Sequence, residues 1–389
     1  MLFTRKFRLL AIVVVIALVI VGTRRAQPYL RATALILDLT GNAPRVRAWL
    51  PVRSVPVTTR DLDVPARHGA IHARLYRPAA PSGRTIAVFP GVHGGGVDEP
   101  RMSALCTKLA ATGLTVLAAP LPELRVYTIL PRSTDDIEDV AVWLAAQRDL
   151  TPSGRIGIVG VSFAGGLALV AAGRPSLDGK VNLVTALGSQ GDLPRAMQYL
   201  CTGVLPDGTA QPQHDYGPAV ILLAAVRHFV PPDQEMPLRA AITRFLDASS
   251  DDVTNPTRAT ARFAEARAMG DALPEPARTV MRWVDTRDVQ TMGPKLLPYI
   301  EELGGAAALS PERSPATQAP VFLLHGSHDN VIPSTETLKL ETYLRAQGNA
   351  RVTSLLTPLI SHANVEGAPS IGEVWKLVQF WAAVLRAAA

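Results

Sequence analysis

The chain has 389 residues, of which 48% are hydrophobic and 19% are charged, and its net charge is +6. This composition is globular, can bury a large core, and excludes a Pro-rich or repeat architecture. The charge is uneven, because residues 1–60 hold ten Lys or Arg and the single acid Asp38, which leaves the remainder at about −3. A near-neutral body with a basic N-terminal segment argues against a nucleic acid partner and favours a membrane surface.

An uncharged apolar run extends from Leu9 to Gly22, between basic residues on both sides. As a helix it would span about 21 Å, against roughly 30 Å of hydrocarbon, and snorkelling arginines can cover the difference. No small-x-small cleavage site precedes Arg24, so we expect residues 1–25 to be an uncleaved transmembrane anchor rather than a signal peptide. The body is then expected outside the cytoplasm, at a bacterial-type inner membrane, or secreted if the segment is cleaved.

Residues 26–54 are assigned to a linker. Within it, residues 29–41 have roughly helical spacing of apolar side chains and could lie on the membrane or dock on the body. From residue 55 the pattern changes to strands, and "VPVTTRDLDVP" and "IHARLYRP" are typical of an antiparallel pair.

Strands and helices then alternate along the chain. The apolar strands are predicted at 85–91, 114–120, 156–161, 180–189, 319–326 and 350–357. The helices are predicted at 98–113, 133–147 (opened by a capping Ser or Thr, with acids in its first turn), after residue 162, and at 371–388. Continuous apolar strands between helices predict an α/β fold with a mostly parallel sheet covered on both faces.

Residues 190–315 interrupt this alternation with a helical, Pro-rich segment, and the strands resume after it. We therefore assign residues 55–189 and 316–389 to one α/β core and residues 190–315 to a helical cap inserted into it. The most apolar piece of the cap, residues 217–230, suggests either an acyl-binding surface or, more simply, a buried cap helix.

Candidate catalytic residues follow the strands at their carboxyl ends, where open α/β sheets place their chemistry. Ser162 follows the strand at 156–161 in "GVSFAGG", Asp329 follows the strand at 319–326, and His362 follows the strand at 350–357. The strand at 85–91 leads into "GVHGGG". Serine, acid and histidine thus occur in the order of a nucleophile-elbow hydrolase.

On these motifs the chain resembles the α/β-hydrolase superfamily, in its dienelactone-hydrolase-like and serine esterase- or peptidase-like branches, over residues 55–388. The resemblance implies a Ser162–Asp329–His362 triad in which His362 activates the serine and Asp329 orients the histidine. The amide of Phe163 and a second one from the loop after the third strand, within Val92 to Gly95 and so including His93 and Gly94, would stabilise the oxyanion. Ala164 departs from the family pattern G-x-S-x-G, although it is small.

The function expected is cleavage of a carboxylic ester or thioester through an acyl-enzyme, in the carboxylesterase class, with a small ester or acyl compound as substrate. The alternatives are an acyltransferase or peptidase with the same triad, or an inactive hydrolase-like binding protein at the membrane. No CxxC or His/Cys cluster has ligand spacing, so no metal or cofactor is expected. The oligomeric state and any pairing of Cys106 with Cys201 stay open.

Overall fold

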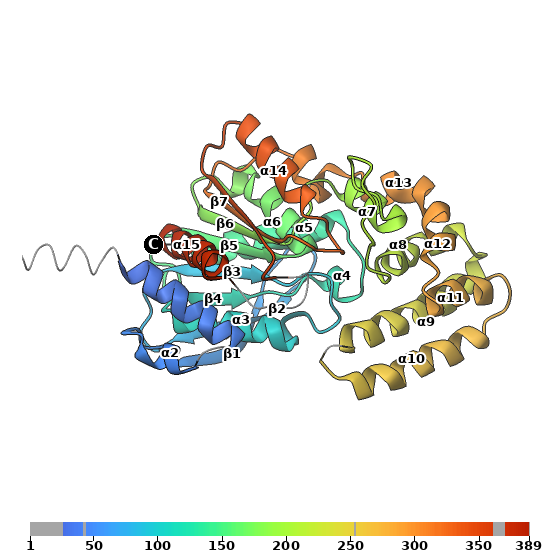
Figure 1. Ribbon diagram of the computed structural model, residues 1–389, viewed down its shortest axis with the longest axis horizontal. Helices are drawn as coiled ribbons and strands as arrows, with labels where there is room; N and C mark the ends of the chain where they lie inside the picture. The colour runs from blue at the N-terminus through green and yellow to red at the C-terminus, as the bar shows by residue number, and fades with distance from the viewer. Residues whose placement is uncertain (1–25, 42–43, 253, 361–369, 389) are drawn as a thin grey trace, which may run out of the picture.

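The computed structural model describes residues 26–41, 44–252, 254–360 and 370–388, and Figure 1 shows their arrangement. A central sheet of eight strands has the order β1-β2-β4-β3-β5-β6-β7-β8, in which β1 pairs antiparallel with β2, β2 pairs antiparallel with β4, and the pairs beyond are parallel. The strands are β1 Val57–Val64, β2 Ile71–Pro78, β3 Thr85–Phe89, β4 Thr115–Ala118, β5 Ile156–Val161, β6 Val181–Leu187, β7 Val321–Gly326 and β8 Val352–Thr357. The strands predicted from the sequence are therefore confirmed to within about two residues at each end.

Helices cover both faces of the sheet. One face packs against α5 and α6, with α14 beyond them, and the other against α3 and α15. The strands β3 and β5, at the centre, are buried along nearly their whole length, as parallel strands between two helical layers must be. The bounds of the core helices are α2 Pro44–Trp49, α3 Pro100–Ala111, α4 Pro122–Arg125, α5 Pro131–Ala146, α6 Phe163–Ala172, α14 Thr335–Ala346 and α15 Ile371–Ala387.

The start of α5 differs from the prediction. The helix begins at Pro131 with Leu130 as its N-cap residue, and no side chain caps it. Ser133 therefore lies inside the first turn, which contains no acid. Proline at the first position has a backbone angle already suited to the helix, which explains the earlier start.

Residues 26–40 form a helix that docks on the body, which was one of the two options left open by the sequence. Ala32, Leu35 and Ile36 of this N-terminal helix are buried in the hydrophobic cluster that contains α3 and α15. Its Tyr29 stacks on Trp375 of α15 with ring centroids 5.7 Å apart. No helix within the described ranges is long and apolar enough to cross a membrane, and the predicted anchor, residues 1–25, lies outside them.

Between β6 and β7 the described chain contains helices and no strand of the sheet, so this segment is referred to below as the cap. Figure 1 shows it, in yellow-green to orange, at the opposite end of the molecule from the N-terminal helix. Its most apolar helix, α8, is largely buried, as an ordinary cap helix would be. The cap helices are α7 Leu193–Thr202, α8 Gly217–Ala225, α9 Pro232–Asp251, α10 Pro256–Asp271, α11 Ala277–Asp285, α12 Val289–Leu296 and α13 Ile300–Gly304.

Cys106 and Cys201 are both buried, and they are free thiols rather than a disulfide. Cys106 belongs to α3 and Cys201 to α7 of the cap. Burial raises the pKa of each thiol to about 12, so neither is a ready nucleophile at neutral pH.

Candidate active site

Ser162 occupies a sharp turn between β5 and α6. Its backbone angles are φ 55° and ψ −134°, a combination that a residue with a side chain rarely adopts. Its amide donates to the carbonyl of Leu187 on β6 at 2.7 Å, which fixes the turn to the sheet. A strained serine held between a parallel strand and a helix is the geometry of a nucleophile elbow.

Small residues make this turn possible. A Cβ atom at Gly160 would collide with the carbonyl oxygen of Ala164, and one at Gly165 would collide with Oγ of Ser189. Both positions therefore require glycine, since the strand and the helix cross in contact here. Ala164 itself is fully buried in the core, so the departure from the family pattern is accommodated.

The loop after β3 packs directly against the serine. A Cβ atom at Gly91 would lie 2.8 Å from Cβ and 3.5 Å from Oγ of Ser162. Val92, the next residue of this loop, and Phe163 line one cavity. The Val92 amide donates no hydrogen bond to any described residue.

The other residues of this loop are engaged with their own surroundings. The amide of His93 donates to the carbonyl of Leu124 at 3.2 Å, and the amide of Gly95 donates to Nδ1 of His93 at 3.0 Å. Because Nδ1 accepts a hydrogen bond, the neutral ring carries its proton on Nε2. Burial lowers the pKa of His93, which favours this neutral form. His93 and Gly95 thus hold the loop in shape.

A tyrosine that the sequence did not single out supports the same loop. Tyr127 is buried, has φ 58°, and places its hydroxyl where a Cβ atom at Gly94 would be 2.9 Å away. The hydroxyl lies 2.9 Å from Oδ1 of Asp247 and 2.9 Å from Oγ of Ser250, both on cap helix α9. Burial raises the pKa of Tyr127, so the phenol stays protonated and donates to the carboxylate. The loop and the cap are therefore joined through one hydroxyl.

Asp329 lies in the loop after β7 and is buried. Its Oδ1 accepts hydrogen bonds from the amides of Val331 at 2.9 Å and Ile332 at 3.0 Å. Its Oδ2 lies 3.4 Å from Nε2 of His325. The carboxylate is thus fixed in place by the backbone of its own loop.

Two other histidines lie close to Asp329 in the sequence. The buried His325 bonds Thr337 through Nδ1 at 2.7 Å and the carbonyl of Ile332 through Nε2 at 2.8 Å, so both ring nitrogens are committed to holding the loop. His328 is exposed. His362 lies outside the described residues, so its position relative to Ser162 and Asp329 stays a prediction.

The sheet brings the loops that follow β5, β7 and β8 to one edge. Leu187 of β6 pairs with both Val161 and Leu324, and Gly326 of β7 pairs with Thr357 of β8. Neighbouring strands lie about 4.8 Å apart, so the ends of β5 and β7, which flank β6, are separated by about 10 Å. Ser162 and Asp329 follow these two ends. The chain after β8 leaves the sheet at the same edge.

An apolar cavity of about 40 Å³ lies between the core and the cap, and Phe163, the residue after Ser162, is part of its lining. The core contributes Val92, Phe163 and Val331, whereas the cap contributes side chains of α7 and α8, including Met197 and Val220. Among the described residues, no group of His, Cys, Asp and Glu has the arrangement of a metal site. The cavity suits a small apolar group.

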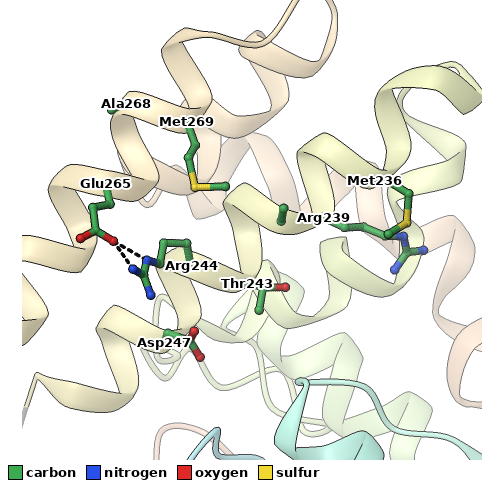
Figure 2. Close-up of a pocket in the computed structure, with 9 residues that line it drawn as sticks. Met236, Arg239, Thr243, Arg244, Asp247, Glu265, Ala268 and Met269 are labelled. Carbon is green, nitrogen blue, oxygen red and sulfur yellow. Dashed lines mark hydrogen bonds and ion pairs between the residues drawn. The ribbon is translucent and has the colours of Figure 1, made fainter.

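A larger hollow of about 770 Å³ lies on the cap surface between α9 and α10 (Figure 2). Arg244 and Glu265 bridge it with a hydrogen bond of 2.6 Å, and Met236 is largely exposed at its rim. None of the candidate catalytic residues lines it. Asp247, at its edge, is the residue that reaches inward to Tyr127.

The segments that enter and leave the cap are hydrogen-bonded to each other next to α7. The carbonyl of Gly191 accepts from the amide of Glu312 at 3.0 Å, so the entering and leaving chains are paired. The fully buried Glu336 of α14 accepts from the amide of Gly191 at 2.9 Å and from Nε of Arg195 at 2.5 Å. Arg195 also bonds Glu312 at 2.7 Å. The base of the cap is therefore fixed to the core by a buried ionic network.

Comparisons with known proteins give similarity in structure alone. No family model matches the sequence, and no curated protein matches it. A mutant of the rice cell wall degrading esterase LipA from Xanthomonas oryzae is 14% identical over 88% of this chain and 93% of its own, with a TM-score of 0.54. An esterase from Pyrobaculum calidifontis is 18% identical over 94% of this chain and 92% of its own, with a TM-score of 0.45. The likeness to the Xanthomonas esterase, at 14% identity and a TM-score of 0.54, shows a shared fold.

Proposed function

We propose that this chain, which has the α/β-hydrolase fold, is a serine hydrolase that cleaves carboxylic esters through an acyl-enzyme. The observation that carries the proposal is the strained backbone of Ser162, at φ 55° and ψ −134°, with Gly91 packed against its side chain. Strain of this kind persists where the surrounding structure enforces it, and such positions cluster at active sites.

The proposed reaction divides one difficult step into two. His362 takes the hydroxyl proton of Ser162 as Oγ attacks the carbonyl carbon of the ester, and the proton then passes to the departing alcohol. Water, deprotonated by the same histidine, attacks the acyl carbon; the bond to Oγ of Ser162 breaks, the histidine returns the proton to Oγ, and the acid is released. Asp329, held by two backbone amides, would orient the histidine and stabilise its charged form.

The amides of Phe163 and Val92 are the proposed donors to the oxyanion. Phe163 is the first residue of α6, where the helix leaves amides unpaired and the helix dipole favours negative charge. Val92 follows Gly91 on the adjacent loop. Each donor of this kind contributes roughly 2.7–4 kcal/mol to transition-state stabilisation. His93, Gly94 and Gly95 would act by holding this loop.

The cavity beside Phe163 supports an acyl substrate over a charged one, because its lining is dominated by apolar side chains. Thioesters carry the same acyl group and are included in the proposal. A peptidase or an acyltransferase would use the same residues. A peptidase differs from an esterase in its leaving group, which is an amine, and an acyltransferase differs in its acceptor, which is not water. The alternative that is not an enzyme is an inactive hydrolase-like binding protein at the membrane.

We also propose that residues 1–25 anchor the chain in a membrane with the body outside the cytoplasm. The support is the apolar run from Leu9 to Gly22 and the basic residues that flank it. Carbonate extraction of membranes from cells that make the full chain tests the anchor, and protease added to intact spheroplasts tests the side. Release of the chain from the membrane by carbonate would contradict the anchor. Protection of the body from the added protease would contradict its position outside the cytoplasm.

The hydrolase proposal is tested with p-nitrophenyl esters of increasing acyl length and the full chain in detergent. We expect hydrolysis by the wild type and a loss of at least about a thousandfold in Ser162→Ala and His362→Ala. Both variants should keep the wild-type melting temperature. Unchanged hydrolysis in folded Ser162→Ala would contradict the proposed nucleophile, and a folded wild type inactive on esters, thioesters and peptides would favour the binding protein.

A further inference from the structure

Three arginines line one cleft at the end of the molecule opposite the cap. Arg31 comes from the N-terminal helix, Arg84 from the residue before β3, and Arg386 from the last turn of α15. The cleft has a volume of about 180 Å³, and none of its lining residues is acidic. Figure 1 shows the N-terminal helix, in blue, beside the red α15.

Contacts with the neighbouring helices hold two of these side chains. Nη1 of Arg84 donates to the carbonyl of Leu385 at 3.4 Å. The guanidinium of Arg386 lies over the ring of Tyr29, 5.2 Å from its centroid, and donates to the tyrosine hydroxyl at 3.4 Å. These partners are neutral, so they orient the arginines without compensating their charge.

Within the described ranges, Arg31, Arg84 and Arg386 form no ion pair with any carboxylate. Arg31 and Arg84 are both partly buried. Burial lowers the pKa of Arg84, and the charge of Arg31 acts in the same direction. Like charges gathered in a partly desolvated cleft repel one another, so a bound anion would stabilise the arrangement.

A second cleft, of about 150 Å³, adjoins the first and shares Arg31 with it. It adds Lys108 and Arg53, and its acid Asp38 is already paired with Arg47 at 2.9 Å. The positive charge therefore extends from the first cleft into the second, on both sides of Arg31. A guanidinium presents paired N–H donors that match two oxygens of a phosphate group, which makes arginine the usual residue for binding it.

We infer that this basic cleft binds the phosphate group of an acidic phospholipid. The described part of the helix that forms its wall, from residue 26, follows four residues after the end of the apolar run at Gly22 in the sequence. Basic residues next to a membrane segment are attracted to acidic head groups. The inference concerns a site remote from Ser162, and it stands or falls independently of the hydrolase chemistry.

Native mass spectrometry of the full chain in non-ionic detergent, with equimolar phosphatidylglycerol and phosphatidylcholine, tests it. We expect the wild type to retain phosphatidylglycerol preferentially. The double variant Arg31→Gln/Arg84→Gln should lose that preference by about fivefold or more. The control Arg267→Gln/Arg282→Gln removes two exposed arginines of the cap and should behave as the wild type. All proteins keep Arg24 and Arg25, so non-specific attraction to these residues cancels.

An unchanged lipid preference in a folded Arg31→Gln/Arg84→Gln protein would overturn the site. Titration of the same proteins with inorganic phosphate, followed by calorimetry, separates the two sources of a phosphate group. We expect inorganic phosphate to give no measurable heat of binding at concentrations at which phosphatidylglycerol is retained. Tight binding of inorganic phosphate that the double variant abolishes would overturn the lipid assignment and identify a site for a soluble anion.

Discussion

The hydroxyl of Tyr127 lies 2.9 Å from Oδ1 of Asp247, and this hydrogen bond joins the segment between α4 and α5 to helix α9 of the cap. The same hydroxyl contacts Gly94, whose missing side chain leaves room for it. The shape of the loop after β3, which contains Gly94, therefore depends on the position of the cap. A displaced cap would move Gly94 and, through it, the amide of Val92.

Replacing Tyr127 by Phe should lower kcat by about tenfold and leave KM within about twofold, because the loop loses its support while the apolar cavity is kept. Asp247→Asn preserves an oxygen acceptor and should retain most of the activity, whereas Asp247→Ala should behave as Tyr127→Phe. Steady-state kinetics on a short-chain ester distinguishes these cases. If all three variants kept the kcat of the wild type and only their melting temperature were lower, Tyr127 would have a purely structural role.

Gly91→Ala should lower kcat/KM by about a hundredfold, since misplacement by about 1 Å can have an effect of this size. The added Cβ would lie 2.8 Å from Cβ of Ser162 and 2.9 Å from the carbonyl oxygen of Val161, so the loop must move. Gly372→Ala is the matched control, because its Cβ would meet nothing closer than 3.9 Å. Wild-type kinetics in Gly91→Ala would show that the loop has no part in the reaction.

Glu336→Gln should destabilise the protein by about 3 kcal/mol, because it leaves the half-buried Arg195 without one of its two carboxylates. The base of the cap should loosen, and limited proteolysis should cut between residues 190 and 315 faster than in the wild type. Glu373→Gln breaks an exposed pair with Lys376 and should change stability by less than about 0.5 kcal/mol. Equal stability of the two variants would contradict a cap fixed by this network.

The stability of the core should depend on pH through Asp136 of α5. Burial, helped by the charge of Glu123, raises the pKa of Asp136 from 3.8 to about 6. Between about pH 4 and 6 the folded state therefore holds a proton that the unfolded state has lost, so stability falls as pH rises through this window. The shift corresponds to about 3 kcal/mol at neutral pH.

Asp136→Asn removes this penalty, and its melting temperature should exceed that of the wild type at pH 8 and match it near pH 4. Asp135→Asn is the contrasting variant. Burial acts to raise the pKa of Asp135, but hydrogen bonds from His68 and Arg174 lower it overall. Its charge stabilises the folded state above pH 4, so this variant should melt at a lower temperature at neutral pH. A lower melting temperature in Asp136→Asn than in the wild type at pH 8 would contradict a destabilising charge at this position.

The fold could be predicted from the sequence because continuous apolar strands alternate with amphipathic helices, and the resemblance to α/β-hydrolases is confirmed at the level of the fold. The positions of Ser162 and Asp329 at strand ends followed from the same pattern. The contact between Tyr127 and Asp247 could not be predicted, since it joins residues 120 positions apart on elements whose packing only the folded chain defines. The role of Glu336 could not be predicted for the same reason, because no local motif marks a buried carboxylate that accepts hydrogen bonds from residues distant in the sequence.

Labelling with a fluorophosphonate tests most directly whether Ser162 is an activated nucleophile. The full chain in detergent would be treated with the reagent, digested, and the modified residue located by mass spectrometry, beside Ser162→Ala and His362→Ala. We expect one adduct, on Ser162, in the wild type, and none in either folded variant. An adduct on another residue would contradict the proposed hydrolase. So would the absence of any adduct both in the folded wild type and in the Glu336→Gln variant, whose cap is expected to be looser.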